Sequence, residues 1–263
     1  MTEHNPRAPS KVDFGRAAGD YAKHRHGFPP ALFDRFVALG LMRPGTVALD
    51  LGTGTGTVAR GLAQRGAKVT ALDPSTALMD QARALDAEAG VSIDYVEGKA
   101  EATGLDTGAF DLVVAGQCWH WFDRPKAVAE ARRLLRSGGT LAIAHFDWLP
   151  LPGNMVEATE QLIVAYNPAW KMGGGTGIYG RWYTDLRGGG LEDVQGFSFD
   201  TVAPYTHEAW RGRIRASAGV AASLDAGEVE KFDAELAGIL AEQFPDDPLA
   251  VPHCVSAVWG THR

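Results

Sequence analysis

A carboxylate followed by alternating glycines is the feature of this sequence that most directly suggests chemistry. Asp50 lies in the apolar run 47–51 and precedes Gly52, Gly54 and Gly56. Glycine at such a turn lets the backbone take positive φ angles and approach a ligand closely, because no Cβ is in the way. A helical pattern follows directly, and the first turn of a helix offers free N–H groups. A strand, a glycine turn and a helix in this order predict a nucleotide-binding loop.

Two classes of nucleotide fit this loop. The spacing Gly54-x-Gly56-x-x-Ala59 satisfies the fingerprint of NAD(P)-dependent dehydrogenases, and Asp73 follows near the position of a ribose-binding acid. Against this interpretation, Asp50 stands where a dinucleotide would bring its anionic pyrophosphate. S-adenosylmethionine avoids the conflict, since its ammonium and sulfonium groups are positive and it carries no phosphate.

Three further segments downstream extend the pattern. The four pieces are ALDLGTGTGTVAR, VTALDPS, GKAEATGLD and FDLVVAGQCWHWFDRPKAVAEARRLLRSGGTLAI. In order and spacing they resemble the class I S-adenosylmethionine-dependent methyltransferases, particularly the small-molecule type 11 branch that includes trans-aconitate methyltransferase. The resemblance covers residues 14–146, somewhat more than half of the chain. It implies an α/β, Rossmann-like doubly wound sheet of seven strands in the order 3-2-1-4-5-7-6, with the last strand antiparallel and a helical cap insertion.

The same resemblance assigns cofactor contacts to individual positions. It implies that the glycine loop faces the methionine moiety of S-adenosyl-L-methionine, and that Asp73 accepts hydrogen bonds from both ribose hydroxyls. The implied cofactor-binding residues are Tyr21, Arg25, Asp50, Gly52, Thr53, Gly54, Gly56, Asp73, Pro74, Ser75, Ala100, Glu101 and Gln117. Tyr21 and Arg25 resemble the N-terminal lid of this branch, and for Arg25 an ordinary place on the surface is an equal alternative.

Two histidines are candidates for an acid–base role. Transfer of a methyl group to a neutral hydroxyl or an activated carbon needs a base, whereas transfer to an ionised carboxylate does not. His120, in the segment 118–121, follows the fourth expected strand, and His145 ends the fifth. For both residues a role limited to packing or hydrogen bonding is the alternative. Cys118 is not expected to act as a nucleophile, because the reaction requires no covalent intermediate.

Residues 147–182 depart from the core pattern and predict a cap that selects the substrate. Aromatic walls with a few polar groups are typical of small-molecule sites. The candidate substrate-binding residues are Trp119, Trp148, Trp170, Tyr179 and Arg181. Packing inside the cap explains each aromatic ring equally well. Arg181, Arg213 and Arg215 could hold an acidic substrate bidentately, with a plain surface location as the alternative.

Strand-like and helix-like segments alternate along the first half of the chain, which predicts a parallel sheet with right-handed crossovers. The expected strands are residues 47–51, 69–72, 91–96, 110–115, 140–146, 194–202 and 253–259. We expect one domain with four parts. These are an N-terminal helical lid (1–45), a cofactor-binding core (46–146), the substrate cap (147–190) and a C-terminal part of the sheet with helices (191–263).

The composition narrows the function classes. The 263 residues are 45% hydrophobic and 22% charged, as is ordinary for a globular protein with a sizeable core. A net charge of −7 argues against a nucleic-acid surface, which needs a basic stripe. No apolar run approaches the roughly 20 residues that span a bilayer, and residues 1–11 do not have the apolar core of a secretory signal. Two cysteines provide neither a disulfide framework nor a zinc pattern, so a cytoplasmic location is expected.

Together these features predict a cytoplasmic S-adenosylmethionine-dependent methyltransferase that acts on a small-molecule metabolite, without a metal and as a monomer or homodimer. The HWFD segment resembles the branch with carboxylate methyltransferases. O-methylation of a carboxylate or hydroxyl, or tailoring of a secondary metabolite, is the expected reaction. Two alternatives stay open: an NAD(P)-dependent dehydrogenase, and a non-catalytic module that binds S-adenosylmethionine.

Overall fold

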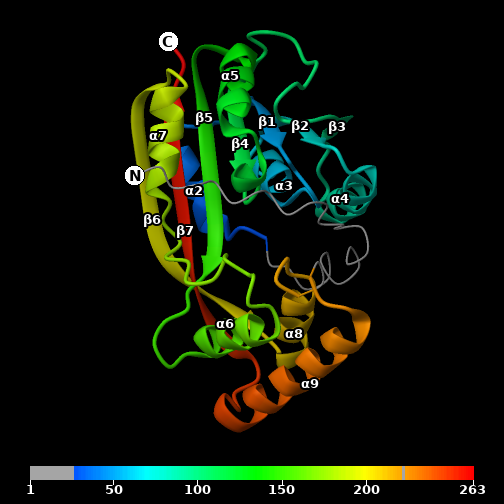
Figure 1. The fold of residues 1–263 in the computed structure, drawn as a ribbon. Helices are drawn as coiled ribbons and strands as arrows, with labels where there is room; N and C mark the ends of the chain where they lie inside the picture. The colour runs from blue at the N-terminus through cyan, green and yellow to red at the C-terminus, as the bar shows by residue number, and fades with distance from the viewer. Residues whose placement is uncertain (1–26, 221–222) are drawn as a thin grey trace. The chain divides into compact units, whose positions relative to one another are not determined.

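The computed structural model describes residues 27–220 and 223–263, which divide into two compact units (Figure 1). The larger unit contains residues 27–149, 175–203 and 252–263. The smaller contains the described residues within 150–174 and 204–251. Two of the points where the chain passes between the units, 149/150 and 174/175, fall inside the segment predicted as the substrate cap (147–190). Residues 1–26 of the expected N-terminal helical lid (1–45), with Tyr21 and Arg25, lie outside the described residues.

A seven-stranded sheet organises the larger unit. The strands are β1 Val47–Leu51, β2 Lys68–Asp73, β3 Asp94–Glu97, β4 Phe110–Gly116, β5 Leu135–Trp148, β6 Glu192–Tyr205 and β7 Leu249–Thr261. Their order is β3-β2-β1-β4-β5-β7-β6. Strands β1 to β5 pair in parallel, and β7 runs antiparallel to β5. The predicted fold class is therefore confirmed, including the strand order and the reversed last strand (Figure 1).

Five helices belong to the described part of this unit. They are α2 Pro30–Ala38, α3 Thr57–Ala63, α4 Thr76–Ala89, α5 Arg124–Leu134 and α7 Gly180–Gly188, with a short 3₁₀ turn, η1, at Trp119–Trp121. Ser75 and Asp123 cap α4 and α5, because their side chains accept hydrogen bonds from the N–H groups of Leu78 and Lys126. These hydrogen bonds satisfy N–H groups of the first helical turn, which have no partner within the helix. Gly90, with a φ angle of 67°, ends α4.

The central strands form the buried core of the sheet. Strands β1 and β4 and the middle of β5 are almost fully buried, as apolar strands are when both faces of a parallel sheet are covered. Strand β5 is longer than predicted at both ends, because it begins directly after α5 at Leu135 and continues to Trp148. The carboxyl ends of β1, β2, β4 and β5 lie at one edge of the sheet, where ligands bind in open α/β folds.

The smaller unit has its own helical core. Its helices are α6 Met155–Tyr166, α8 His207–Arg215 and α9 Ala226–Gln243. Trp210 is fully buried, and its indole N–H donates to the Thr159 hydroxyl at 3.1 Å. Phe232 is fully buried as well, with its ring centroid 5.5 Å from that of Tyr166. Large side chains from all three helices therefore meet inside this unit.

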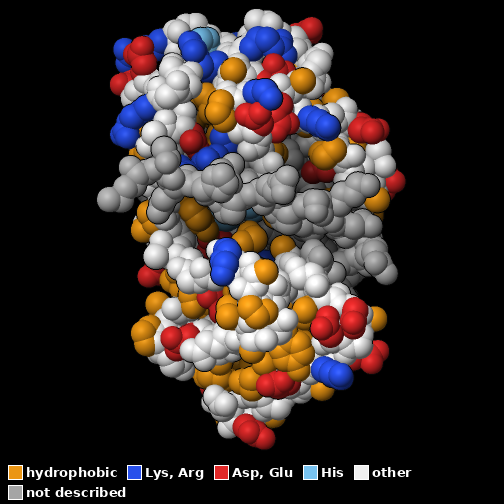
Figure 2. Space-filling model, viewed as in Figure 1, with side chains coloured by type: hydrophobic (Ala, Val, Ile, Leu, Met, Phe, Trp, Pro, Cys, Tyr) orange, Lys and Arg blue, Asp and Glu red, His pale blue; other side chains and the backbone are white. Residues whose placement is uncertain are grey.

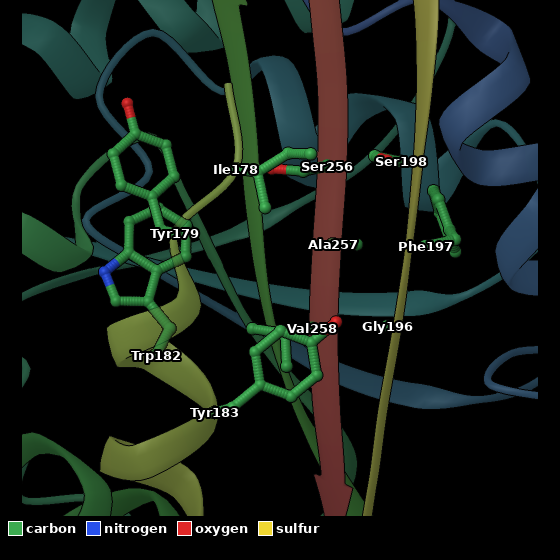
Figure 3. Close-up of a pocket in the computed structure, with 10 residues that line it drawn as sticks. All are labelled: Ile178, Tyr179, Trp182, Tyr183, Gly196, Phe197, Ser198, Ser256, Ala257 and Val258. Atoms are coloured by element: carbon green, nitrogen blue, oxygen red, sulfur yellow. The ribbon is translucent and has the colours of Figure 1, made fainter. Parts of the chain in front are cut away.

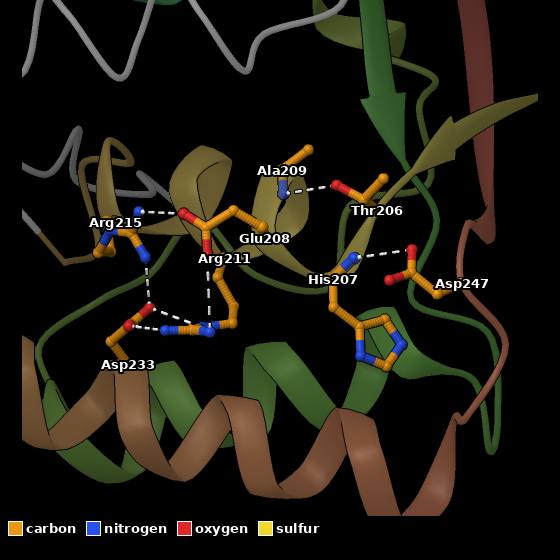
Figure 4. Close-up of polar contacts among 8 residues, drawn as sticks. All are labelled: Thr206, His207, Glu208, Ala209, Arg211, Arg215, Asp233 and Asp247. Carbon is orange, nitrogen blue, oxygen red and sulfur yellow. Dashed lines mark hydrogen bonds and ion pairs between the residues drawn. The ribbon is translucent and has the colours of Figure 1, made fainter.

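An ion-pair network joins α8 to α9 (Figure 4). Nε of Arg211 donates to Asp233 at 3.0 Å, and Nη1 of Arg215 donates to the same carboxylate at 2.6 Å. Burial raises the pKa of Asp233, but the two guanidinium groups outweigh burial and hold this pKa below its ordinary value. Arg215 also approaches Glu208 at 3.4 Å. Arg215 could bind an acidic substrate only if its ion pairs with Asp233 and Glu208 were broken.

The surface of the described residues is mixed in charge. On the face shown in Figure 2, Lys and Arg side chains lie among Asp and Glu side chains. The described residues on that face therefore form no continuous basic stripe of the kind that nucleic acids bind. In residues 27–220 and 223–263, no helix is long and apolar enough to cross a membrane.

Candidate functional site

The loop between β1 and α3 has the backbone that its glycines predict. Gly52, Gly54 and Gly56 have φ angles of 66°, 55° and 77°, a region that glycine adopts without steric cost. Among the described residues, no atom lies within 4 Å of a Cβ placed on Gly54, whereas a Cβ on Gly56 would come within 2.9 Å of the Tyr95 hydroxyl. Gly54 therefore borders open space, and Gly56 is required by packing within the chain.

Asp50 is buried beneath this loop. Its Oδ2 accepts hydrogen bonds from the Thr53 hydroxyl at 2.7 Å and from the N–H of Ala59 at 3.1 Å, so it fixes the loop to the first turn of α3. Its Oδ1 is buried and accepts no hydrogen bond from the described residues. Burial raises the pKa of Asp50 to about 7, although the two hydrogen bonds act in the opposite direction.

Asp73 ends β2 beside the same loop. One carboxylate oxygen accepts a hydrogen bond from the N–H of Gly54 at 2.9 Å, and the other accepts one from the N–H of Ser75 at 2.8 Å. Burial raises the pKa of Asp73 against the effect of these two bonds. Its charge also contributes to the raised pKa of Asp50. Pro74, the next residue, is exposed. Two interacting carboxylates at the glycine loop favour a cationic ligand over an anionic one.

The segment predicted to border the adenine is held against α5. Ala100 is buried, and Glu101 accepts a hydrogen bond from the N–H of Asp123 at 2.9 Å. Thr103 donates through both its N–H and its hydroxyl to Glu130, at 2.9 and 2.6 Å. Hydrogen bonds from the Arg133 guanidinium lower the pKa of Glu130 to about 2. An ionised carboxylate on α5 therefore anchors the loop that contains Ala100 and Glu101.

Gln117 joins the carboxyl ends of β4 and β5. Its φ angle of 56° is uncommon for a residue with a side chain. Its N–H donates to the carbonyl of Ala144 at 2.9 Å, and its side-chain amide donates to the carbonyl of Phe146. Strained backbone of this kind clusters at functional sites. The geometry is consistent with the place beside the cofactor that the sequence predicts for Gln117.

The two candidate bases lie next to one another. His120 belongs to η1 and is exposed, whereas His145 on β5 is buried. Their ring centroids are 5.6 Å apart. The ring of Trp121 lies 4.6 Å from that of His120. The two histidines meet because β4 and β5 are neighbours in the sheet and both end at the same edge.

His145 has a carboxylate neighbour, Asp147, that was not among the predicted site residues. Its Nε2 lies 3.3 Å from Oδ1 of Asp147, and the hydroxyl of Tyr179 donates to Oδ2 of the same carboxylate. The rings of Tyr179 and Trp182 stack 4.2 Å apart and lie 4.7 and 5.3 Å from the His145 ring. We call these four residues, His145, Asp147, Tyr179 and Trp182, the His145 cluster. The spacing His-x-Asp could have predicted this contact, because residues two apart on a strand point to the same face of the sheet.

The candidate substrate-binding residues do not form one group. Trp119 is 1% exposed and its indole N–H donates to a carboxylate of α7 at 3.1 Å, a geometry that favours packing. Trp148 is half-buried at the end of β5, and Arg181 is exposed on α7. Trp170 belongs to the smaller unit. Of the five, only Tyr179 joins the His145 cluster.

Neither cysteine offers evident reactivity. Cys118 and Cys254 are buried and form no disulfide. Sγ of Cys118 contacts the carbonyl of Leu51 at 3.0 Å, directly below the glycine loop. Within the described part of the chain, no group of three or more His, Cys, Asp or Glu side chains is arranged to hold a metal ion.

A pocket of about 170 Å³ lies between α7 and strands β6 and β7 (Figure 3). The rings of Tyr179, Trp182 and Tyr183 line it from α7 and the residues before it, and Ser256 lines it from β7. None of its ten lining residues is charged. Tyr179 and Trp182 belong to both this pocket and the His145 cluster. Ser256 pairs directly with His145 in the register of β5 and β7, so the pocket adjoins the cluster.

Comparison with protein families identifies the part of the chain that carries the cofactor site. Residues 49–143 match a family model described as a methyltransferase domain. This range contains the glycine loop, Asp73, the Ala100 segment, Gln117 and His120. Residues 49–143 are thus similar to a methyltransferase domain, and the strand order of the sheet is the one that the resemblance to class I S-adenosylmethionine-dependent methyltransferases predicts. The family predicted from the sequence is confirmed, whereas the trans-aconitate branch stays a prediction.

Curated relatives share this region. An uncharacterised methyltransferase of Mycobacterium tuberculosis is 35% identical over 137 residues, which cover 52% of this chain and 53% of the relative. The chain thus spans about half the length of this relative. A ubiquinone biosynthesis O-methyltransferase of Xanthomonas campestris is 27% identical over 197 residues, which cover 74% of this chain and 80% of the relative.

Solved structures share the fold at low sequence identity. A protein of Anaeromyxobacter dehalogenans described as a type II methyltransferase has a TM-score of 0.65 at 24% identity, covering 90% of this chain and 97% of the other. A phosphoethanolamine N-methyltransferase 2 of Haemonchus contortus, in complex with phosphomonomethylethanolamine and S-adenosylhomocysteine, has a TM-score of 0.54 at 19% identity. That match covers 98% of this chain and 61% of the other. At these identities the similarity shows the fold alone.

Proposed function

We propose that this protein transfers a methyl group from S-adenosyl-L-methionine to a small-molecule metabolite. The observation that carries the proposal is the pair of buried carboxylates at the glycine loop, Asp50 and Asp73. Burial raises the pKa of both, so a positively charged ligand beside them stabilises their ionised forms. A pyrophosphate would have the opposite effect. This contrast supports S-adenosylmethionine over the nicotinamide dinucleotide of the dehydrogenase alternative.

The residues around the loop suit the rest of the cofactor. Each oxygen of Asp73 accepts one hydrogen bond from the described residues and keeps a lone pair for a ribose hydroxyl. Within the described residues Gly54 borders open space, which suits the methionine moiety. The loop of Ala100 and Glu101 takes the adenine, and Gln117 lies toward the sulfonium. Contacts of Tyr21 and Arg25 with the cofactor stay a prediction from the sequence, because both residues lie outside the described part of the chain.

When bound, the cofactor supplies an electrophilic methyl group. The protein then has to align the acceptor with that methyl group and exclude water, since the reaction is an in-line displacement. A neutral acceptor also needs a base, for which His120 and His145 are the candidates. The O-methyltransferase among the curated relatives supports oxygen as the acceptor atom. We therefore propose O-methylation of a hydroxyl or carboxyl group.

The proposed activity is tested by transfer of a labelled methyl group. The full chain is incubated with methyl-labelled S-adenosylmethionine and a protein-free metabolite extract. We expect the label in a small-molecule product, with one S-adenosylhomocysteine formed for each methyl group transferred. The Asp73→Ala variant, which lacks the ribose-binding carboxylate, should form neither. A protein that binds S-adenosylhomocysteine yet transfers no label would be a binding module and would contradict the proposal.

A further inference from the structure

We propose that the pocket between α7 and strands β6 and β7 is a second ligand site, apart from the site of methyl transfer. Its ligand is an uncharged aromatic molecule of one ring that carries one hydroxyl group. The pocket lies wholly within the larger unit (Figure 3). This inference goes beyond the proposed function, because it assigns a ligand that is bound but not methylated.

One face of strands β6 and β7 forms the floor of the pocket. Ser256 and Val258 are two apart on β7, so their side chains share one face of the sheet. Gly196 and Ser198 share a face of β6 in the same way. Val258 is 3% exposed and packs in a buried cluster with Trp182 of α7. The face with Ser256 and Val258 is therefore the one that α7 covers.

Aromatic rings form the walls of the pocket. The rings of Tyr179 and Trp182 stack 4.2 Å apart on one side. A Cβ on Gly196 would collide with the Tyr183 hydroxyl, so glycine at this position lets the phenol of α7 reach the backbone of β6. In Figure 3 the Tyr183 hydroxyl points from α7 toward Gly196. Walls of this kind are typical of sites for flat apolar molecules.

Ser256 is the buried polar group of the pocket. It is 8% exposed, and within residues 27–220 and 223–263 its hydroxyl has no hydrogen-bond partner. In the same part of the chain, the hydroxyls of Tyr183 and Ser198, which also line the pocket, have no partner either. A buried polar group almost always has a hydrogen-bond partner. A ligand in the pocket supplies the partner that Ser256 lacks.

The lining of the pocket disfavours charged ligands. None of the ten lining residues is charged, so an ionised carboxylate or ammonium group would lose its hydration there without gaining a counter-charge. Tyr179 provides only its ring, because its hydroxyl donates to Asp147. An uncharged hydroxyl group of a ligand both donates and accepts hydrogen bonds, as the Ser256 hydroxyl does. The two groups are therefore complementary.

The volume of the pocket limits the ligand to one ring. The pocket measures about 170 Å³, and an apolar cavity of about 150 Å³ holds benzene. Water suits this space poorly, because a bound water needs about two to four polar partners and aromatic rings form the walls. A ring with one hydroxyl group contacts these walls and also forms a hydrogen bond with Ser256.

The pocket is too far from the glycine loop to hold the methyl acceptor. In the sheet, β4 and β5 separate β7 from β1, which leads into the glycine loop. Neighbouring strands lie about 4.8 Å apart, so β7 is roughly 14 Å from β1 and roughly 10 Å from β4. Gln117, the proposed neighbour of the sulfonium, follows β4 directly. Methyl carbon and acceptor must approach to about 3–3.5 Å, so a ring in the pocket does not receive the methyl group.

Fluorine NMR of the full chain measures binding to this pocket directly. The probes are para-fluorophenol, which carries an uncharged hydroxyl group at neutral pH, para-fluorotoluene, which lacks this group, and para-fluorobenzoate, which is charged. We expect saturable binding of para-fluorophenol and no binding of para-fluorobenzoate. Saturation of the chain with S-adenosylhomocysteine should change the affinity for para-fluorophenol by less than about twofold, since the two sites are separate. Methyl-labelled S-adenosylmethionine should leave no label on this probe.

Three variants test whether the probe occupies this pocket. Ser256→Ala should weaken binding of para-fluorophenol about fivefold and change that of para-fluorotoluene less than about twofold, because only the phenol loses a hydrogen bond. Gly196→Ala should weaken both probes about tenfold, because the added methyl group displaces the Tyr183 hydroxyl. Ser137→Ala, an exposed substitution near the start of β5, is the matched control and should bind like the wild type. Melting temperatures show that each variant is folded.

The possible outcomes distinguish this site from the proposed function. Failure of the wild type to bind para-fluorophenol would overturn the ligand site, and so would unchanged binding in folded Ser256→Ala or Gly196→Ala. Displacement of the probe by S-adenosylhomocysteine, or methylation of the probe, would overturn its separation from the site of transfer. A chain that binds the probe but not S-adenosylhomocysteine would keep the ligand site and overturn only the proposed methyl transfer.

Discussion

Replacing Asp73 by alanine is expected to weaken binding of S-adenosylhomocysteine by at least about 10²-fold. In the proposed site this carboxylate accepts hydrogen bonds from two ribose hydroxyls, and each hydrogen bond to a charged group contributes about 1.5–3 kcal/mol. The substitution also removes the acceptor for the N–H groups of Gly54 and Ser75, so the loop loses its link to β2. Titration calorimetry of both proteins at one pH and salt concentration measures the difference.

Two other variants show whether the lost affinity comes from the missing contact between Asp73 and the ligand. Asp73→Asn keeps one acceptor oxygen and should bind with intermediate affinity. Asp94→Ala removes an exposed carboxylate at the start of the neighbouring strand β3 and should bind like the wild type. If Asp73→Ala binds S-adenosylhomocysteine as tightly as the wild type, the carboxylate is a structural cap and does not contact the ribose.

The ligand-free protein is expected to lose stability through Asp50 as the pH rises from about 4 to about 7. Burial raises the pKa of this carboxyl from 3.8 to about 7 in the folded state. Over that interval the folded state keeps a proton that the unfolded chain has released, so the stabilising contribution is complete below about pH 4 and lost through about pH 7. At about 1.4 kcal/mol per pH unit, the whole effect is on the order of 4 kcal/mol.

Urea unfolding at pH 5 and pH 8 measures this contribution when the wild type is compared with Asp50→Asn. Other groups titrate as well. Glu130 is common to both proteins and cancels in the comparison, whereas the interaction of Asp73 with Asp50 is part of the difference that is measured. The free energy of unfolding should decline more steeply with pH in the wild type. Parallel profiles for the two proteins would mean that Asp50 is ionised in the folded state throughout this range.

The affinity for S-adenosylhomocysteine should increase with pH, whereas the stability of the ligand-free protein decreases. The ammonium of S-adenosylhomocysteine is attracted to ionised Asp50, so binding should release a proton below about pH 7 and become tighter as the pH rises through 7. Titration calorimetry in two buffers of different ionisation enthalpy measures the proton release directly. The Asp50→Asn variant is the matched control, and its affinity should depend less on pH.

The backbone of the glycine loop and the helix caps beside it could be predicted because their residues lie in short contiguous segments. The loop 50–56 and the caps at Ser75 and Asp123 follow from local rules for glycine and for helix starts. The structure reproduces these features residue by residue. The strand order came instead from the resemblance to a family, since local patterns predict strands without predicting which strands become neighbours.

The surroundings of His145 depend on contacts between distant segments. Asp147 lies just beyond the predicted end of the fifth strand, and only the longer strand places it on the same face as His145. Tyr179 meets Asp147 because residues before α7 pack on β5, which local periodicity does not encode. Trp119 is the opposite case. This aromatic residue next to the candidate base His120 was predicted to bind the substrate, but its side chain is buried in the core.

The glycine loop should bind S-adenosylmethionine and its product but not a nicotinamide dinucleotide. Titration calorimetry of the wild-type chain with S-adenosylhomocysteine and, separately, with NAD⁺ measures this difference. We predict saturable binding of S-adenosylhomocysteine at micromolar concentration and no binding of NAD⁺. Saturable binding of NAD⁺ with no heat from S-adenosylhomocysteine would contradict the account.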